Sequence, residues 1–289
     1  MLVTPKVTLN YINSAGQEIG LNFDSSFVCE ACEETSNNQI HSIKQGGTHG
    51  QFFTGMSLDW RNIRLTGHVR KGITLENAMS SLQNVFNPTI SGTLIYENER
   101  MGLRREISCR VAELPQVRWG ARRLKFDISL VALDPFWRGM SVIENIAETL
   151  KKFYFPVYIP QEGMSFGLRK KTLESQFDNM GNVESGFLVV FRALYGSVIN
   201  PEIRNTDTGE RIRMLYTMQK GDVITILNDL QERRVEINGV NGFRHLDAAN
   251  TTFFKIAVGT NRIGFWADGN INNLSVHMRY TPNFTFVEG

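Results

Sequence analysis

The sequence predicts a mainly β protein built from two domains. Short runs in which apolar and polar residues alternate recur along the 289 residues, and turn-forming glycine, asparagine and aspartate separate them. Only one stretch shows clear helical periodicity. The strand pattern changes past residue 137, and each side is long enough to bury a core of its own. We therefore expect domains over 1–137 and 151–289, joined by a connector over 138–150.

The first domain begins with a predicted hairpin. Residues 7–12 alternate as a strand, Asn13-Ser14-Ala15-Gly16 forms the turn, and residues 17–23 return. Residues 25–40 follow no clear period. Residues 41–56 contain four glycines and predict a loop or a projecting hairpin.

A single helix is predicted after an extended segment over 60–69. Thr74 can cap it, Glu76 lies in its positively polarised first turn, and Asn87-Pro88 ends it. Its apolar residues share one face, which we expect to pack across a sheet: Leu75, Ala78, Met79, Leu82, Val85 and Phe86. Strand signals resume at 91–96, 105–112 and 124–132, with polar hairpin ends at 97–104 and 115–123.

A structural corner is predicted where the first domain ends, at Asp134, Pro135, Phe136 and Trp137. A strand that runs into Asp-Pro must stop, because proline has no N–H for the next ladder bond and disfavours helix before it. Phe136 and Trp137 then bring large apolar side chains just past the stop. The pattern indicates the end of a sheet with a packed corner.

The second domain is predicted to be a β-sandwich or jelly roll. After the connector, residues 153–167 are aromatic and contain Pro156 and Pro160, which favours an extended edge or a packed linker. Beyond residue 176, strands follow one another at roughly 8–12 residue spacing. They are expected near 187–194, 211–215, 223–227, 235–237, 262–266 and 274–280, and Asn238-Gly239 is a strong hairpin signal.

The composition argues against several classes of function. The 31 basic and 29 acidic residues nearly balance, which is not typical of a protein that grips nucleic acid. No segment approaches the roughly 18 apolar residues of a membrane span, so we expect no membrane insertion. Residues 1–6 lack a signal-peptide core, and we expect the product to stay in the cytosol where it is made.

No arrangement of residues predicts catalysis, a metal site or a cofactor. Cys29-Glu30-Ala31-Cys32 resembles half a zinc site or a redox pair, but no second pair exists, and His41 and His49 are too far apart for a finger. In an extended strand, Cys29 and Cys32 would face opposite sides. We therefore expect structural thiols, with Cys109 alone in another strand, and we expect no enzymatic activity.

Two surface clusters have alternative interpretations. The basic cluster Arg100, Arg104, Arg105, Arg110, Arg118, Arg122, Arg123 and Lys125 could contact nucleic acid. Interleaved glutamates favour a solvated face or a charge-paired subunit contact instead. Tyr195, Trp266 and Arg262 could form a sugar-stacking platform, but aromatic residues that fill a sandwich core are the favoured interpretation.

The chain resembles the distal tail proteins of siphophages. In the first domain the resemblance rests on residues 126–137, Phe-Asp-Ile-Ser-Leu-Val-Ala-Leu-Asp-Pro-Phe-Trp. In the second it rests on the order of Asn179-Met180-Gly181-Asn182, residues 199–205, residues 220–226 and Gly259-Thr260-Asn261. It implies an N-terminal β-sandwich or split-barrel-like ring domain with one helix, followed by a β-sandwich like those of galectins and carbohydrate-binding modules.

The resemblance also implies a structural function. The first domain would form a homo-hexameric ring at the tail tip of the virion, after assembly in the host cytoplasm. Its partners would be the tail tube protein, a central tail-tip or tail-associated lysin protein, and receptor-binding proteins, and duplex DNA would pass the lumen without specific binding. Segments 41–56 and 97–104 could reach neighbouring subunits, so Phe52, Phe53, Arg100, Arg104 and Arg105 are the interface candidates. The alternative is a carbohydrate-binding attachment protein that acts through the second domain.

Overall fold

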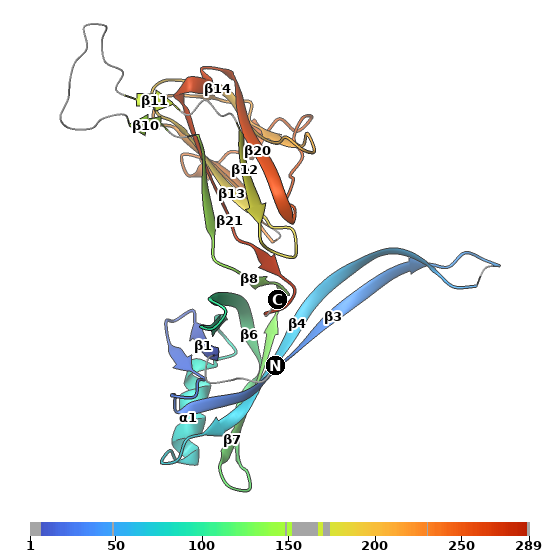
Figure 1. Cartoon of the computed structure of the whole chain (residues 1–289), viewed down its shortest axis with the longest axis vertical. Coiled ribbons are helices and arrows are strands. Elements are labelled where there is room, and N and C mark those ends of the chain that lie inside the picture. The colour runs from blue at the N-terminus through green and yellow to red at the C-terminus, as the bar shows by residue number, and fades with distance from the viewer. Residues whose placement is uncertain are drawn as a thin grey trace. The chain divides into compact units, whose positions relative to one another are not determined.

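The computed structural model describes residues 7–47, 49–147, 149–151, 167–169, 174–229 and 231–287. Its packing contacts divide the chain into two compact units. The first unit comprises Met1–Gly139 together with Phe284–Gly289, and the second comprises Met140–Asn283. The described residues are mainly β, with one α-helix, as the sequence predicts (Figure 1).

The division differs from the expected boundaries in two places. Residues 138–150, expected to be a connector, contain strand β9 (Val142–Ala147), which pairs with β21 (Leu274–Tyr280) in a sheet of the second unit. The end of the chain, from Phe284, belongs to the first unit, although the second domain was expected to run to residue 289. The aromatic segment 153–167 lies outside the described residues except for Gly167.

The first unit contains one large antiparallel sheet. Its strands are β1 (Val7–Asn13), β2 (Glu18–Gly20), β3 (Phe27–Ile43), β4 (Phe52–Val69), β5 (Gly92–Asn98), β6 (Leu103–Trp119) and β7 (Leu124–Ala132), in the order β2-β1-β5-β6-β7-β4-β3. Outside this strand order, β8 (Trp137–Arg138) pairs with β22 (Asn283–Phe284) and with β6. The long strand β6 pairs with β5 through its first half and with β7, across bulges, through its second half.

Inward-facing residues of these strands form one apolar core. Alternating burial along β1 and β7 places every second side chain in it, as the period of a half-buried strand requires. Helix α1 (Leu75–Val85) closes one side: Ala78 and Leu82 are buried, and the Thr74 hydroxyl accepts the Asn77 N–H, which confirms the predicted cap. Just past the helix, Phe86 stacks on Tyr11 with ring centroids 4.2 Å apart.

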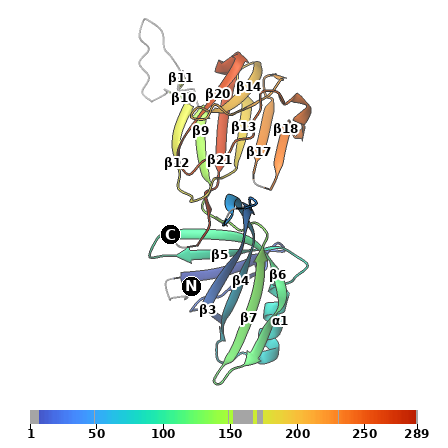
Figure 2. The same ribbon diagram turned by 90° about the vertical axis from the view of Figure 1, so that its right-hand side faces the viewer.

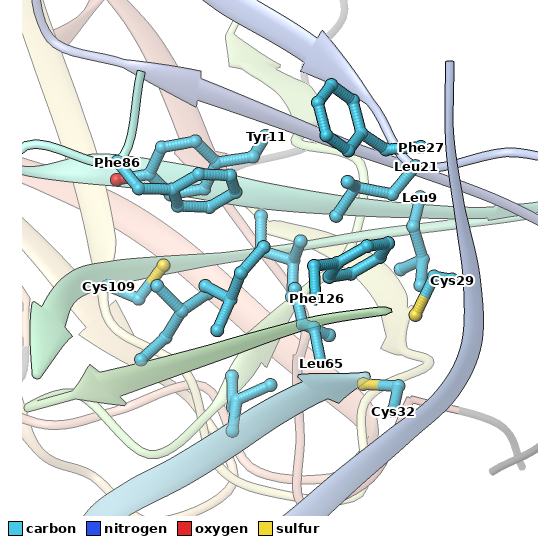
Figure 3. Packing of buried hydrophobic residues seen from close by; sticks show 14 of the residues in the cluster. Leu9, Tyr11, Leu21, Phe27, Cys29, Cys32, Leu65, Phe86, Cys109 and Phe126 are labelled. Atoms are coloured by element: carbon cyan, nitrogen blue, oxygen red, sulfur yellow. The ribbon is translucent and has the colours of Figure 1, made fainter. Parts of the chain in front are cut away.

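The core contains all three cysteines, and this corrects one expectation. Cys29 and Cys32 do not face opposite sides of β3, because the register of β3 on β4 shifts between Cys29 and Ala31 and turns both thiols inward. Figure 3 shows both among apolar side chains that include Leu9, Leu65 and Phe126. Burial raises the pKa of Cys29 and of Cys109 to about 12, so both thiols stay protonated at neutral pH.

The second unit contains two main antiparallel sheets (Figure 2). The six-stranded sheet has the order β19-β18-β17-β13-β21-β9, with β13 (Phe187–Ala193), β17 (Val223–Asn228), β18 (Arg233–Ile237) and β19 (Val240–Asn241). The other contains β12 (Glu174–Asn179), β20 (Gly259–Gly269), β14 (Val198–Asn205), β15 (Arg211–Arg213) and β16 (Thr217–Met218). The remaining elements are β10 (Thr149–Lys151), β11 (Gly167–Arg169), η1 (Phe243–His245) and η2 (Ile271–Asn273).

One core lies between the two sheets, as in a β-sandwich. It is built from the inward side chains of both sheets, among them Val189, Phe191, Ile226, Ile263 and Met278. The predicted Asn-Gly hairpin is confirmed: Asn238 and Gly239 have φ values of 51° and 79°, and they join β18 to β19. Two consecutive positive φ values are what a tight hairpin turn of this type requires.

Residues 140–283 are expected to fold without the rest of the chain, because their core takes side chains only from within that range. The purified fragment should show a cooperative thermal transition by circular dichroism and dispersed amide resonances. A matched fragment 151–283 lacks β9 and should be less stable, because β21 then becomes an unprotected edge. An unfolded 140–283 fragment would mean that the two units share a core.

Candidate functional site: a projecting hairpin and its buried base

The β3–β4 hairpin extends far beyond the sheet from which it starts (Figure 1). β4 pairs with β7 only from Arg61 to His68, whereas its pairing with β3 continues outward to Phe52. The outer part, residues 36–43 and 52–60, is therefore a two-stranded ribbon. Such a ribbon is at best marginally stable in water without further packing.

The outer ribbon carries apolar side chains that are open to solvent. Ile40, Ile43, Phe52, Phe53 and Met56 are each 57–69% exposed. Ile40 lies opposite Met56, and Ile43 lies opposite Phe52, so the apolar residues meet in cross-strand pairs. An apolar cluster of this kind on a projecting element is typical of a surface that another molecule covers. Two of the sequence-derived interface candidates, Phe52 and Phe53, belong to it.

A buried ion pair fixes the base of the hairpin. Arg61 on β4 donates from Nη1 to the Glu34 carboxylate on β3 at 2.5 Å, and the exposed fractions of the two side chains are 4% and 15%. Its Nε donates to the Pro135 carbonyl at 2.7 Å, and its Nη2 donates to the Thr285 carbonyl at 2.6 Å. One guanidinium therefore joins the hairpin, the residues after β7 and the C-terminal segment.

The predicted corner residues lie beside this ion pair. Trp137 is fully buried, and its indole N–H donates to the same Glu34 oxygen at 3.0 Å. The Asp134 carboxylate accepts the Phe136 backbone N–H at 3.3 Å and pairs with Arg138 at 2.8 Å. The turn after β7 is thus held by its own side chains and packed against the start of the hairpin.

The arginine candidates do not join the apolar ribbon. Arg104 on β6 pairs with Glu97 on β5 at 2.5 Å. Arg105 lies over the ring of Phe284, with its guanidinium carbon 3.5 Å from the ring centroid, and burial lowers its pKa. The backbone N–H of Arg100, in the β5–β6 turn, donates to Asn98. Arg104 and Arg105 thus contact neighbours within the first unit.

Sequence reasoning missed the C-terminal contribution to the first unit and the role of Arg61. Thr285 accepts from Arg61, Phe284 lies under Arg105, and Val287 is buried in the core of the first unit. No local pattern marks a segment that packs against residues more than 200 positions away. The alternation of β4 was the signal for Arg61, because it places this arginine at a core-facing position. A buried arginine needs hydrogen-bond and charge partners from elsewhere in the chain.

Trp266 and Arg262 do not form a shared stacking surface for a sugar. The guanidinium carbon of Arg204 lies 4.5 Å from the ring centroid of Trp266 and covers one face of the indole. Arg262 lies four residues from Trp266 on β20, about 13 Å away along a strand, and it pairs with Asp207 at 2.6 Å. Tyr195, in the loop after β13, is largely exposed.

Among the described residues, no group of three or more histidine, cysteine, aspartate or glutamate side chains could hold a metal ion. Within the same residues, no helix is long and apolar enough to cross a membrane.

Two protein families match the chain, one in each half. Residues 14–115 match the phage tail protein RIFT-related domain, and residues 180–284 match the C-terminal domain of the siphovirus-type tail component. The chain belongs to the distal tail protein family of siphophages. It is a structural component of the phage tail. A search of curated protein sequences found no match.

Solved structures share the fold at low sequence identity. The Dit protein of phage SPP1, described as a paradigm of the hub adsorption apparatus in phages that infect Gram-positive bacteria, is 13% identical. It aligns over 96% of this chain and 99% of its own length with a TM-score of 0.67. A chain of the phage P2 baseplate, in its activated conformation with Ca, is 12% identical over 97% and 99% of the two chains, with a TM-score of 0.51. Both similarities show that this chain shares its fold with these proteins over nearly its whole length.

Proposed function

We propose that this distal tail protein closes into a homo-hexameric ring at the tail tip and that the β3–β4 hairpin is the arm that reaches the next subunit. The exposed apolar ribbon is the observation that carries the proposal. Five large apolar side chains project where their own unit offers no partner to cover them. Burying an apolar side chain of this size contributes about 1.5–3 kcal/mol, so a neighbour that covers the ribbon would be held firmly.

A ring of this kind needs a heterologous interface, in which one patch meets a different patch on the next copy. A projecting arm suits that geometry, because its apolar residues lie away from the body that carries them. The buried ion pair at the base supports the same proposal. Arg61 and Glu34 hold both strands at the point where they leave the sheet, so the direction of the arm is fixed before a neighbour binds.

The ring would connect the tail tube protein to a central tail-tip or tail-associated lysin protein. The second unit would hold peripheral parts such as receptor-binding proteins. Duplex DNA would pass through the lumen without specific contacts. Assembly would take place in the host cytoplasm, and the mature ring would remain in the virion. No catalytic step belongs to this function.

Replacing the exposed ribbon residues is expected to prevent ring closure. A variant with Phe52→Ser, Phe53→Ser and Met56→Ser should shift the mass measured by light scattering from oligomer to monomer. Each unit should still unfold cooperatively, because side chains that are exposed in the subunit contribute little to the stability of a single chain. The transition of the first unit should fall only by what assembly of the ring contributed. The matched control replaces two exposed apolar residues of the second unit, Met180→Ser and Val258→Ser, and should keep the oligomer. An oligomer that survives the triple substitution would exclude the ribbon as the ring contact.

A further inference from the structure

We propose that a groove on the outer face of strands β1, β5 and β6 receives the arm of the neighbouring copy. The groove has a volume of about 410 Å³, and its lining includes Ile12, Ser91, Thr93, Ile95, Glu106 and Ser108. The proposal rests on the ring, because it names the surface of one copy on which the arm of the next copy lies.

The groove lies on the face of the sheet that is turned away from the core. Thr93 on β5 is opposite Ile12 on β1 and opposite Ser108 on β6, and core residues alternate with all three along their strands. Ile95 is only 8% exposed, so it lies deep in the groove. Small hydroxyl side chains above an isoleucine leave a recess that a large apolar side chain can enter. Its volume is in the range of binding pockets.

Glu106 gives the groove a negative charge that its own unit leaves unpaired. This half-buried carboxylate makes no hydrogen bond or ion pair with any of the described residues. Its neighbour across the β6–β8 pairing is Arg138, but the guanidinium of Arg138 pairs with Asp134 at 2.8 Å. A half-buried carboxylate without a cation favours a partner that brings one.

The arm carries the complementary features. Between His41 and Met56 the sequence has one lysine, Lys44, and no acidic residue. Lys44 directly follows β3, is exposed, and forms no ion pair with the residues that the structure describes. It is adjacent to the cross-strand pair of Ile43 and Phe52. A cation beside apolar side chains matches a groove that combines isoleucine side chains with one carboxylate.

The arm is long enough to reach a neighbouring copy. At the usual rise of a strand, residues 52–60 extend about 30 Å beyond Arg61. A domain of the size of the first unit has a radius of gyration of about 15 Å. The arm therefore spans a large part of the width of a neighbour.

The groove and the arm are separate patches on one copy. In the strand order, β6 and β7 lie between the pair β1 and β5 and the arm strands β4 and β3. An interface in which the arm of one copy meets the groove of the next is therefore heterologous. This is the type of interface that a closed cyclic ring requires.

Charge reversal at Lys44 and Glu106 tests the contact in the full-length protein. Light scattering over a range of concentrations gives the concentration at which half of the protein is assembled. Lys44→Glu and Glu106→Lys should each raise it by at least about tenfold, because each substitution brings like charges together. The variant with both substitutions restores opposite charges and should assemble within about threefold of the wild type. The matched control, Glu174→Lys, reverses an exposed charge of the second unit and should assemble normally.

Filling the groove is an independent test. Thr93→Trp places a large side chain where the arm would lie, and it should also weaken assembly at least about tenfold. The subunit should still fold, because Thr93 is half-exposed and tryptophan is favoured in strands. The matched control, Ser80→Trp, adds the same side chain at an exposed position of α1 and should leave assembly unchanged. Thermal unfolding of each variant is measured first, and both units should unfold cooperatively.

The outcomes separate the groove from the ring. Normal assembly of Thr93→Trp and of both charge reversals, with loss of the ring only when the ribbon residues become serine, would overturn the groove and leave the ring in place. Weakening by both single reversals without recovery in the double variant would also overturn it. Normal rings of Thr93→Trp that fail to join tails would assign the groove to a different tail protein.

A wild type that stays monomeric would contradict the ring, and the groove then has a test of its own. The probe is a synthetic hairpin of residues 36–60, cross-linked at its base. Binding of this hairpin to the monomer that Glu106→Lys abolishes would keep the groove as the receptor of the arm. Absence of binding to the wild-type monomer would overturn the groove as well.

Discussion

Replacing Trp137 by alanine is expected to destabilise the first unit by about 3–5 kcal/mol, the range for truncating a fully buried aromatic side chain. The indole fills the corner after β7, and its N–H is the second donor to the Glu34 carboxylate. The substitution removes both the packing and that hydrogen bond. Calorimetry should show the transition of the first unit at a lower temperature, while the transition of the second unit stays in place. Ring assembly should be lost with the first unit.

Trp119→Ala is the matched control for this prediction, because the same residue type is removed from the same unit at an exposed position. It should change the free energy of unfolding by no more than about 0.5 kcal/mol. Trp137→Phe should fall between the two, because it keeps most of the volume and loses the N–H. If Trp137→Ala melts like the wild type and still forms rings, Trp137 does not anchor the corner.

Replacing Arg61 by methionine is expected to have an effect of similar size, about 3–5 kcal/mol, because it leaves a buried carboxylate without its cation. Glu34 would lose its cation and keep the bond from Trp137, and the carbonyls of Pro135 and Thr285 would lose the hydrogen bonds that Arg61 donates. The hairpin base, the corner and the C-terminal segment would therefore loosen together. Chemical denaturation measures the loss of stability, and hydrogen exchange should show faster exchange at the base of β3 and β4.

Arg64→Met provides the comparison, since Arg64 lies three residues further on the same strand and its side chain is 55% exposed. Its ion pair with Asp127 lies at the surface, where such pairs contribute about 0–1 kcal/mol. Combining Arg61→Met with Glu34→Met should recover part of the lost stability, because it removes the unpaired charge. Equal losses for Arg61→Met and Arg64→Met would show that burial of the pair does not matter.

Features with a local cause could be predicted from the sequence. The cap at Thr74 and the apolar face of α1 depend on residues within one or two turns, and the Asn238-Gly239 turn depends on two residues that both tolerate positive φ. The strands that cover a core on one face showed the expected alternation. The stop at Asp134-Pro135 also follows from local chemistry, because proline ends the ladder.

Features that depend on distant partners could not be predicted. The outer part of β3 is exposed to solvent on both faces, so its apolar and polar residues do not alternate. Residues 25–40 accordingly show no clear strand period in the sequence. The bulge that turns Cys29 and Cys32 to the same side depends on the register with β4. The return of Thr285 and Val287 to the first unit, and the burial of Arg61, depend on contacts across most of the chain.

The mass of the purified full-length protein tests the central proposal most directly. Six chains of 32.8 kDa give about 197 kDa. Light scattering over a wide range of concentrations should find this mass, and negative-stain images of the same sample should show closed rings with six-fold symmetry. A particle that remains at the 32.8 kDa of one chain at every concentration, with no rings on the grid, would contradict the proposal that the hairpin arm closes a hexamer.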